Sequence, residues 1–217
     1  MTMAPNPPRI PLSNLPDLTP LDPAELASNG TYEAVGIADA SIAEADLSGA
    51  QFLDCQLSIV DAAATDFSSA RFVSCRVERL TAPEFAAPRS SWREVEISHS
   101  RLGATEVFDA NLRAVRFVDC KIGWLNLRAA RMRDVEFIDC VIDELDLSQA
   151  HLERLRFDNC EIRSLRVDRA TLSDVDLRGA QLHHITGLNY LSGTTLTMPQ
   201  AVELTETFAQ HLGITVL

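Results

Sequence analysis

The chain has 217 residues, of which 46% are hydrophobic and 23% are charged, so wholesale disorder is excluded. Its 31 Asp and Glu residues against 19 Lys and Arg residues give a net charge of −12, which argues against direct binding to nucleic acid or to an anionic membrane. No apolar run approaches the roughly 18 residues of a membrane-spanning helix, and residues 1–23 lack the charged-then-apolar order of a signal peptide. We therefore expect a soluble, cytoplasmic protein with reduced cysteines.

A proline-rich leader is the first predicted element. Residues 4–20 carry proline at close intervals and are expected to be irregular. The following segment, Asp22 to Leu26, predicts a short helix, because Asp22 is a suitable cap, Pro23 suits a first turn and Glu25 stands three residues after the cap. We assign residues 1–37 to this leader and an N-terminal cap.

A five-residue period dominates residues 38–190. Every position whose number ends in 2 or 7, from Ile42 to Leu182, is apolar, and a second, mostly apolar column lies two residues before each of them. This period would smear an apolar column around a helix and would alternate between the faces of a straight strand. Both columns point inward if each pentapeptide forms one short extended side followed by a corner.

The motif Phe-x-x-Cys sets the number of sides. It occurs five times, in two groups. The first group starts at Phe52 and Phe72, the second at Phe117, Phe137 and Phe157, and within each group the spacing is 20 residues, or four pentapeptides. The sequence therefore predicts a four-sided β-solenoid of about seven coils, stacked at strand spacing. The step from Cys75 to Cys120 is 45 residues, so we expect one extra pentapeptide, as an outward bulge near residues 82–90, where two prolines cannot donate ladder hydrogen bonds.

Residues 45–49 (ADLSG), 110–113 (ANLR) and 175–179 (VDLRG) resemble the A(D/N)LXX consensus of the pentapeptide-repeat proteins. The resemblance covers about residues 38–187 and implies an all-β fold, a right-handed quadrilateral β-helix. Within that family, the Qnr and MfpA-type quinolone-resistance proteins are thought to imitate DNA and to bind type II topoisomerases. The resemblance thus implies DNA gyrase as a partner and protection against quinolones or toxins.

The period stops in the C-terminal segment, residues 191–217. Thr197 and Pro199 predict the start of a helix and Gly213 its end. The tail is similar to that of MfpA-type proteins, which dimerise through it, and this implies a homodimer. The residues expected at the dimer interface are apolar: Leu204, Phe208, Leu212, Ile214 and Val216. A purely intramolecular cap on the last coil is the alternative.

The cysteines and histidines do not form the patterns typical of disulfide frameworks, metal sites or catalytic sites. All five cysteines (Cys55, Cys75, Cys120, Cys140 and Cys160) fall in the inward column, and we place them in one ladder as core residues without disulfides. The pair His183-His184 faces outward, where a solvated pair is the plainer alternative to a surface metal site. No zinc spacing, nucleophile elbow or phosphate loop occurs, so we expect no enzyme activity, no metal and no cofactor.

The outer surface is where a solenoid usually binds its partners. The candidate partner-binding residues are an apolar outward column with an acidic column beside it, and the expected bulge: Leu53, Val73, Val118 and Ile138; Asp54, Asp119 and Asp139; and Glu84, Phe85 and Arg89. The apolar column has an alternative explanation of equal weight, because β-branched residues favour stacked strands.

The charge distribution limits imitation of DNA. Residues 40–190 carry 24 acidic and 18 basic side chains, a net charge of −6, and Arg128, Arg131 and Arg133 interrupt any uniform anionic face. The predicted function is therefore a non-enzymatic protein–protein interaction. The partner is either gyrase, bound by DNA mimicry, or an unrelated protein that uses the rod as a scaffold.

Overall fold

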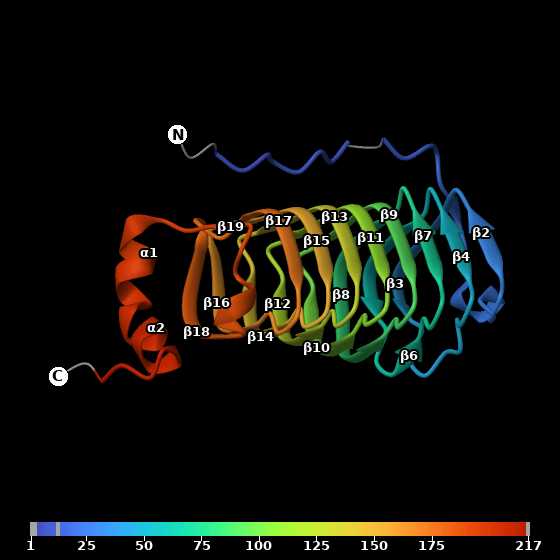
Figure 1. The fold of residues 1–217 in the computed structure, drawn as a ribbon. Helices are drawn as coiled ribbons and strands as arrows, with labels where there is room; N and C mark the ends of the chain where they lie inside the picture. The colour runs from blue at the N-terminus through green and yellow to red at the C-terminus, as the bar shows by residue number, and fades with distance from the viewer. Residues whose placement is uncertain (1–3, 12–13, 216–217) are drawn as a thin grey trace.

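The computed structural model describes residues 4–11 and 14–215, which form a parallel β-solenoid with a small helical part at its C-terminal end (Figure 1). The strands of the first half are β1 (Thr19–Pro20), β2 (Thr31–Glu33), β3 (Val35–Ser41), β4 (Gln51–Leu53), β5 (Gln56–Asp61), β6 (Thr65–Asp66), β7 (Arg71–Val73), β8 (Arg76–Ala86) and β9 (Ser91–Ser98). Those of the second half are β10 (Arg101–Glu106), β11 (Asn111–Val118), β12 (Lys121–Asn126), β13 (Arg131–Ile138), β14 (Val141–Asp146), β15 (His151–Asp158), β16 (Cys160–Arg166), β17 (Thr171–Asp176), β18 (Ala180–Thr186) and β19 (Thr194–Thr195). The helical elements are η1 (Pro23–Glu25), η2 (Leu188–Tyr190), α1 (Met198–Glu203) and α2 (Thr205–His211).

The ladder register confirms a coil of four pentapeptides. From Thr31 to Thr186, the paired residues of neighbouring strands are 20 apart, as in Thr31↔Gln51 and Arg166↔Thr186. The ladder begins before residue 38, where we expected the repeat to start. The four-sided cross-section, the seven coils and the right-handedness stay predictions from the period and the resemblance.

The prediction of an outward bulge near residues 82–90 is wrong. Strand β8 runs through this segment, and Ala82 pairs with Leu102 while Phe85 pairs with both Thr65 and Thr105, all at the unbroken spacing of 20. The 45-residue step between the two Phe-x-x-Cys groups has another cause. Forty of these residues make two full coils, and the remaining five move the motif to the next side of the coil, so no residues are inserted.

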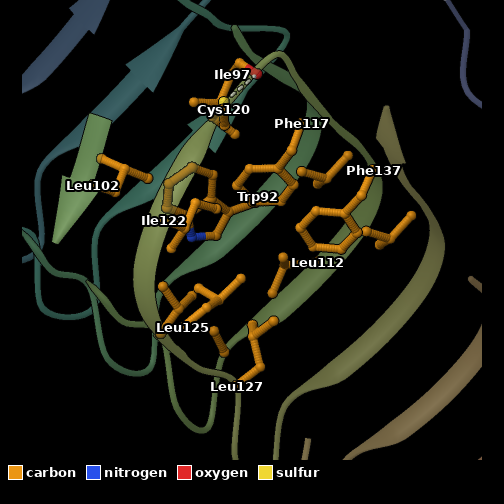
Figure 2. Close-up of a cluster of buried hydrophobic side chains, with 14 of the residues drawn as sticks. Trp92, Ile97, Leu102, Leu112, Phe117, Cys120, Ile122, Leu125, Leu127 and Phe137 are labelled. Carbon is orange, nitrogen blue, oxygen red and sulfur yellow. Dashed lines mark hydrogen bonds between the residues drawn. The ribbon is translucent and has the colours of Figure 1, made fainter. Parts of the chain in front are cut away.

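The core consists of the two inward columns. Of the positions ending in 2 or 7 between Ile42 and Leu182, all but Leu172 are buried. The aromatic rings stack within ladders: Phe52 on Phe72 with centroids 5.2 Å apart, and Phe117 on Phe137 at 4.7 Å. Figure 2 shows the point where the aromatic stack changes sides, between Trp92 and Phe117.

The corners explain the acidic residue of the consensus. Every described non-glycine residue with positive φ has a number ending in 4 or 9, a left-handed backbone that costs about 1 kcal/mol per residue. The Asp at the second consensus position supports this corner: Asp46 Oδ1 accepts the N–H of Ser48 at 3.0 Å, and Asp146 Oδ1 accepts that of Ser148 at 2.9 Å. Hydrogen bonds from Ser48 hold the pKa of Asp46 below its ordinary value.

An alternating column of charges runs along one ladder. Its members, in the order of the rungs, are Arg76, Glu96, Arg116, Glu136, Arg156 and Asp176. Arg116 lies 3.7 Å from Glu96 and 3.2 Å from Glu136, and Arg156 lies 3.9 Å from Glu136. Because opposite charges face each other on successive rungs, this column favours the observed stacking of the coils.

The N-terminal segment is irregular, as expected, but it lies along the solenoid (Figure 1). The backbone N–H and the side-chain Nδ2 of Asn6 donate to the two carboxylate oxygens of Asp174, each at 3.0 Å. The backbone N–H of Arg9 donates to Asp134 Oδ1 at 2.8 Å. We call residues 4–11 the strap. The short helix expected after Asp22 is the 3-10 turn η1, in which Asp22 accepts the N–H of Ala24.

The C-terminal helix begins at its predicted cap, Thr197, and is interrupted at Leu204, so it forms the two short helices α1 and α2. Gln200 is buried, and its Nε2 donates to the backbone carbonyls of Leu177 and Ala180, both at 2.7 Å. These bonds satisfy two acceptors at the open end of the last coil. In the described part of the chain, no helix is long and apolar enough to cross a membrane.

Candidate functional site

The interior of the solenoid is filled with side chains. A void of about 30 Å³ lies where the aromatic stack changes sides, and its lining is apolar except for Thr105. This volume accommodates a water molecule at most, because small-molecule sites typically have about 300–1,000 Å³. The Oγ1 of Thr105 finds no hydrogen-bond partner among the described residues.

The five cysteines are buried core residues, as predicted, but they lie in two ladders. Cys55 and Cys75 share one ladder, whereas Cys120, Cys140 and Cys160 share another. Each thiol donates to a backbone carbonyl of the preceding coil, for example Cys75 Sγ to Phe52 O at 3.3 Å and Cys120 Sγ to Ile97 O at 3.5 Å (Figure 2). The hydrogen bond with Cys55 and burial raise the pKa of Cys75, which keeps this thiol protonated.

The expected apolar column is divided between two ladders. Leu53 and Val73 are neighbours on β4 and β7, and the next rung of their ladder is Arg93. Val118 and Ile138 are neighbours on the second half of β11 and β13. All four expected residues are only partly exposed. The structure therefore does not bring them together as one stripe.

The expected acidic column is divided in the same way. Asp54, Asp119 and Asp139 occupy corners with φ of 53°, 48° and 52°, where Asp is tolerated better than most residues. Asp119 and Asp139 share one corner ladder, in which His99 Nδ1 lies 2.9 Å from Asp119 Oδ2 and Asn159 Nδ2 donates to Asp139 Oδ1 at 2.5 Å. Asp54 belongs to a different corner. The left-handed backbone of the corners therefore explains why Asp occurs at these positions, and no ligand is needed to explain it.

The three candidates from the expected bulge have different positions. Phe85 is buried in the core, 6% exposed, with its ring centroid 5.4 Å from that of Phe67, so it is not available to a partner. Glu84 is exposed within strand β8, and Arg89 is exposed at a corner of the coil. The prediction for Phe85 is wrong, because the segment continues the β8 ladder and its apolar residue follows the inward period.

The C-terminal candidates are divided between the inside and the outside. Leu204 is buried and Phe208 packs partly against the core, so both serve the cap on the last coil. Leu212 and Ile214 are 71% and 55% exposed. Val216 lies outside the described residues. Met198 and Val202 are also exposed, which leaves an apolar tip beyond the last coil.

A buried ion pair lies beneath the strap. The side chains of Asp134 and Arg154 are each 8% exposed, and Arg154 Nε and Nη2 donate to the Asp134 carboxylate at 2.6 and 2.9 Å. Arg154 also pairs with Glu153. Burial opposes ionisation of Asp134, but the hydrogen bonds from Arg154 and from the backbone of Arg9 prevail and lower the pKa of this carboxyl. The same carboxylate therefore holds the strap and orients Arg154.

The outer surface also has shallow, open depressions. One of about 740 Å³ lies near the C-terminal end and is lined by Asp139, Asn159, Glu161, Arg178 and Gln200, among others. The pair His183-His184 is exposed, and His183 Nε2 lies 3.7 Å from Glu161. Within the residues that the structure describes, no group of three or more His, Cys, Asp or Glu side chains is arranged to hold a metal ion.

Comparison with known proteins identifies the repeat. Residues 110–186 match the family model described as a pentapeptide repeat region. The chain carries a pentapeptide repeat region. The match contains the strands from β11 to β18 completely, and the same 20-residue register continues outside it to Thr31. No curated protein matches the sequence.

Several solved structures are similar to the chain. A trypsin-treated variant of QnrB1, a plasmid-mediated fluoroquinolone resistance protein, is 20% identical over 88% of this chain and 91% of its own, with a TM-score of 0.28. Full-length QnrB1 is 18% identical, over 87% and 94%, with a TM-score of 0.29. HetL from the cyanobacterium Nostoc sp. strain PCC 7120, a pentapeptide repeat protein involved in heterocyst differentiation regulation, is 15% identical, over 81% and 93%, with a TM-score of 0.27. At these values the likenesses carry no argument about what this chain binds.

Sequence reasoning missed two features of this solenoid. The first is Gln200, whose role was detectable because it stands three residues after the Thr197 cap and completes a capping box. The second is the strap, whose partners Asp134 and Asp174 lie more than 120 residues away in the chain. No local pattern indicates such a contact.

Proposed function

We propose that the chain is a non-enzymatic, cytoplasmic protein-binding module whose partners dock on the outside of the solenoid. The filled interior carries this proposal. Because the inward columns are occupied by packed apolar side chains and backbone-bonded thiols, the groups that can meet another molecule are the outward columns, the corners and the two ends.

The test is a capture experiment followed by reconstitution. The full chain, immobilised, is exposed to native lysate, and retained proteins are purified and rebound to the wild type and to variants with altered charge on a single ladder. The proposal is supported by a partner that binds the wild type stoichiometrically and no longer binds a variant in which the charge of one ladder is altered. If purified candidates bind no ladder specifically, the proposal is wrong.

Gyrase binding by DNA mimicry is the finer candidate, with protection from quinolones or toxins as its consequence. Part of one ladder supports it: Asp46, Asp66 and Glu106 lie on its outward side, with Ala86 between the last two. Beyond Glu106 the ladder continues with Asn126, the buried Asp146 and Arg166. The measurement is DNA supercoiling by purified gyrase, with and without a quinolone, in the presence of the chain. No change in supercoiling and no protection would remove this candidate.

We further propose that the apolar tip forms a homodimer interface. Large apolar side chains that remain more than half exposed, such as Met198, Val202 and Leu212, commonly mark association sites. Leu212→Asp is expected to convert a dimer to a monomer in light scattering without changing the melting temperature. Phe208→Asp is the matched control for the cap, because it should lower stability. A Leu212→Asp protein with an unchanged dimer mass would contradict this interface.

A further inference from the structure

A concentrated basic surface lies on this otherwise acidic chain. Two outward columns flank the buried ladder that contains Trp92 and Leu112, and the corner that precedes these columns adds two further arginines. We call this set the arginine surface; it consists of Arg71, Arg89, Arg93, Arg113, Arg128, Arg131 and Arg133. All seven side chains are exposed. The chain as a whole has a net charge of −12, so this local excess of positive charge runs against its composition.

Three of these arginines stack directly on one another. Arg93 pairs with Arg113, and Arg113 pairs with Arg133, on consecutive rungs at a spacing of about 4.8 Å. Like charges directly opposite each other on neighbouring strands destabilise a sheet. The alternating column that begins at Arg76 shows that the same coils place opposite charges on successive rungs elsewhere.

Negative charge compensates this stack only at its two ends. Arg93 lies 3.7 Å from Glu94, and Arg133 lies 3.4 Å from Glu153 and 3.8 Å from Asp134. The central Arg113 forms no ion pair among the described residues, and the same holds there for Arg71 and Arg131. The side chains of Arg93 and Arg133 are 53% and 54% exposed, so they remain accessible to a second molecule. The arrangement favours a negatively charged partner.

The extent of the surface indicates the kind of partner. From Arg71 to Arg131 there are three rungs, about 14 Å. The neighbouring column of Arg93, Arg113 and Arg133 is bounded by Glu33, beyond Leu53 and Val73, at one side and by Glu153 at the other. A short acidic segment fits this length, whereas a long polyanion such as a nucleic acid would extend over acidic regions. Arginine, rather than lysine, suits bidentate binding of carboxylates.

The column also continues into an apolar pair. Leu53 and Val73 occupy the two rungs before Arg93, so an apolar side chain that follows the acidic segment would find partly exposed apolar surface. We propose that the arginine surface binds an acidic segment of a partner protein, with an apolar residue seated over Leu53 and Val73. This inference rests on the protein-binding function proposed above and names the surface and the partner chemistry.

The test uses a fluorescein-labelled six-residue peptide of four glutamates followed by leucine and valine, because four extended residues span about 13 Å. Its binding to the full chain is measured by fluorescence anisotropy at low and at physiological salt. The variant is Arg93→Ser/Arg113→Ser. The matched control is Arg101→Ser/Lys121→Ser, which removes the same charge from exposed, directly paired residues on β10 and β12. We expect the arginine variant to bind about tenfold more weakly or worse, and the control to bind within about twofold of the wild type.

Stability gives a second readout. If the stack serves binding and not folding, Arg113→Ser should leave the melting temperature unchanged or raise it, because like-charge repulsion is relieved. A lower melting temperature would show a structural role and would overturn the proposal. So would equal loss of peptide binding in the control, or tighter binding of a ten-nucleotide single-stranded DNA than of the peptide. Loss of self-association in the arginine variant would instead assign the surface to a second copy of the chain.

The two proposals fail in distinguishable ways. If the peptide does not bind the wild type but a reconstituted partner binds another ladder, the arginine surface is wrong and the protein-binding function stands. If neither the peptide nor any purified partner binds the wild type, both are wrong.

Discussion

The stacked phenylalanines give the most direct test of the packing. Phe137 is 0% exposed, and its ring lies between those of Phe117 and Phe157, at centroid distances of 4.7 and 5.1 Å and interplanar angles of 5° and 13°. Phe-to-Ala changes in protein cores cost about 3–5 kcal/mol, and each aromatic pair contributes about 0.5–1.5 kcal/mol within that sum. Because ladder hydrogen bonds hold the backbone on both sides, the cavity cannot collapse. We expect Phe137→Ala to lose about 4–5 kcal/mol.

The comparison with two other phenylalanines sharpens this prediction. Phe117 is 6% exposed and has one stacked ring neighbour, so Phe117→Ala should lose about 3 kcal/mol. Phe108 is partly exposed in an outward column, and Phe108→Ala should lose less than about 1 kcal/mol. The assay is urea unfolding followed by circular dichroism and by tryptophan fluorescence, whose coincidence tests two-state behaviour. A loss below about 1 kcal/mol for Phe137→Ala, or a larger loss for Phe117→Ala, would refute the assigned packing.

Three further predictions concern polar groups. Thr105→Val should raise the free energy of unfolding by about 1 kcal/mol, since a buried hydroxyl without a partner among the described residues is replaced by a methyl group; a decrease in urea unfolding would contradict this. Glu136→Gln should lose about 1–2 kcal/mol, because the side chain is 12% exposed between two arginines, whereas the control Glu161→Gln, 36% exposed, should change stability by less than about 0.5 kcal/mol in the same assay. The pKa of Asp134 is lowered in the folded state. The hydrogen bond from the Arg9 amide to its carboxylate is therefore fully formed above the ordinary value of 3.8 and is lost as the pH falls through the folded pKa. In an NMR titration the Arg9 amide should shift with a midpoint below 3.8 and should not titrate in Asp134→Asn; a midpoint at or above 3.8 would argue against this hydrogen bond.

The period of the amino-acid sequence was enough to predict which residues face the core. A strict period of five places an apolar residue at every inward position from Ile42 to Leu182, and this pattern has one geometric solution, an extended side with a corner. The consensus Asp of each corner and the Thr197 cap are local signals for the same reason. Their partners lie within three residues, so spacing alone identifies them.

Which outward residues are neighbours depends on the winding of the coil and could not be predicted from the period. Positions that look equivalent in the repeat lie on different sides when they differ by 5 residues and on adjacent rungs when they differ by 20. This is why Val73 belongs with Arg93 and not with Val118, and why the 45-residue step was misread as a bulge. The strap contact with Asp134 and the stack around Arg113 depend on the same winding. An interaction between distant residues leaves no mark in a local pattern, because the coil brings them together only after the register is set.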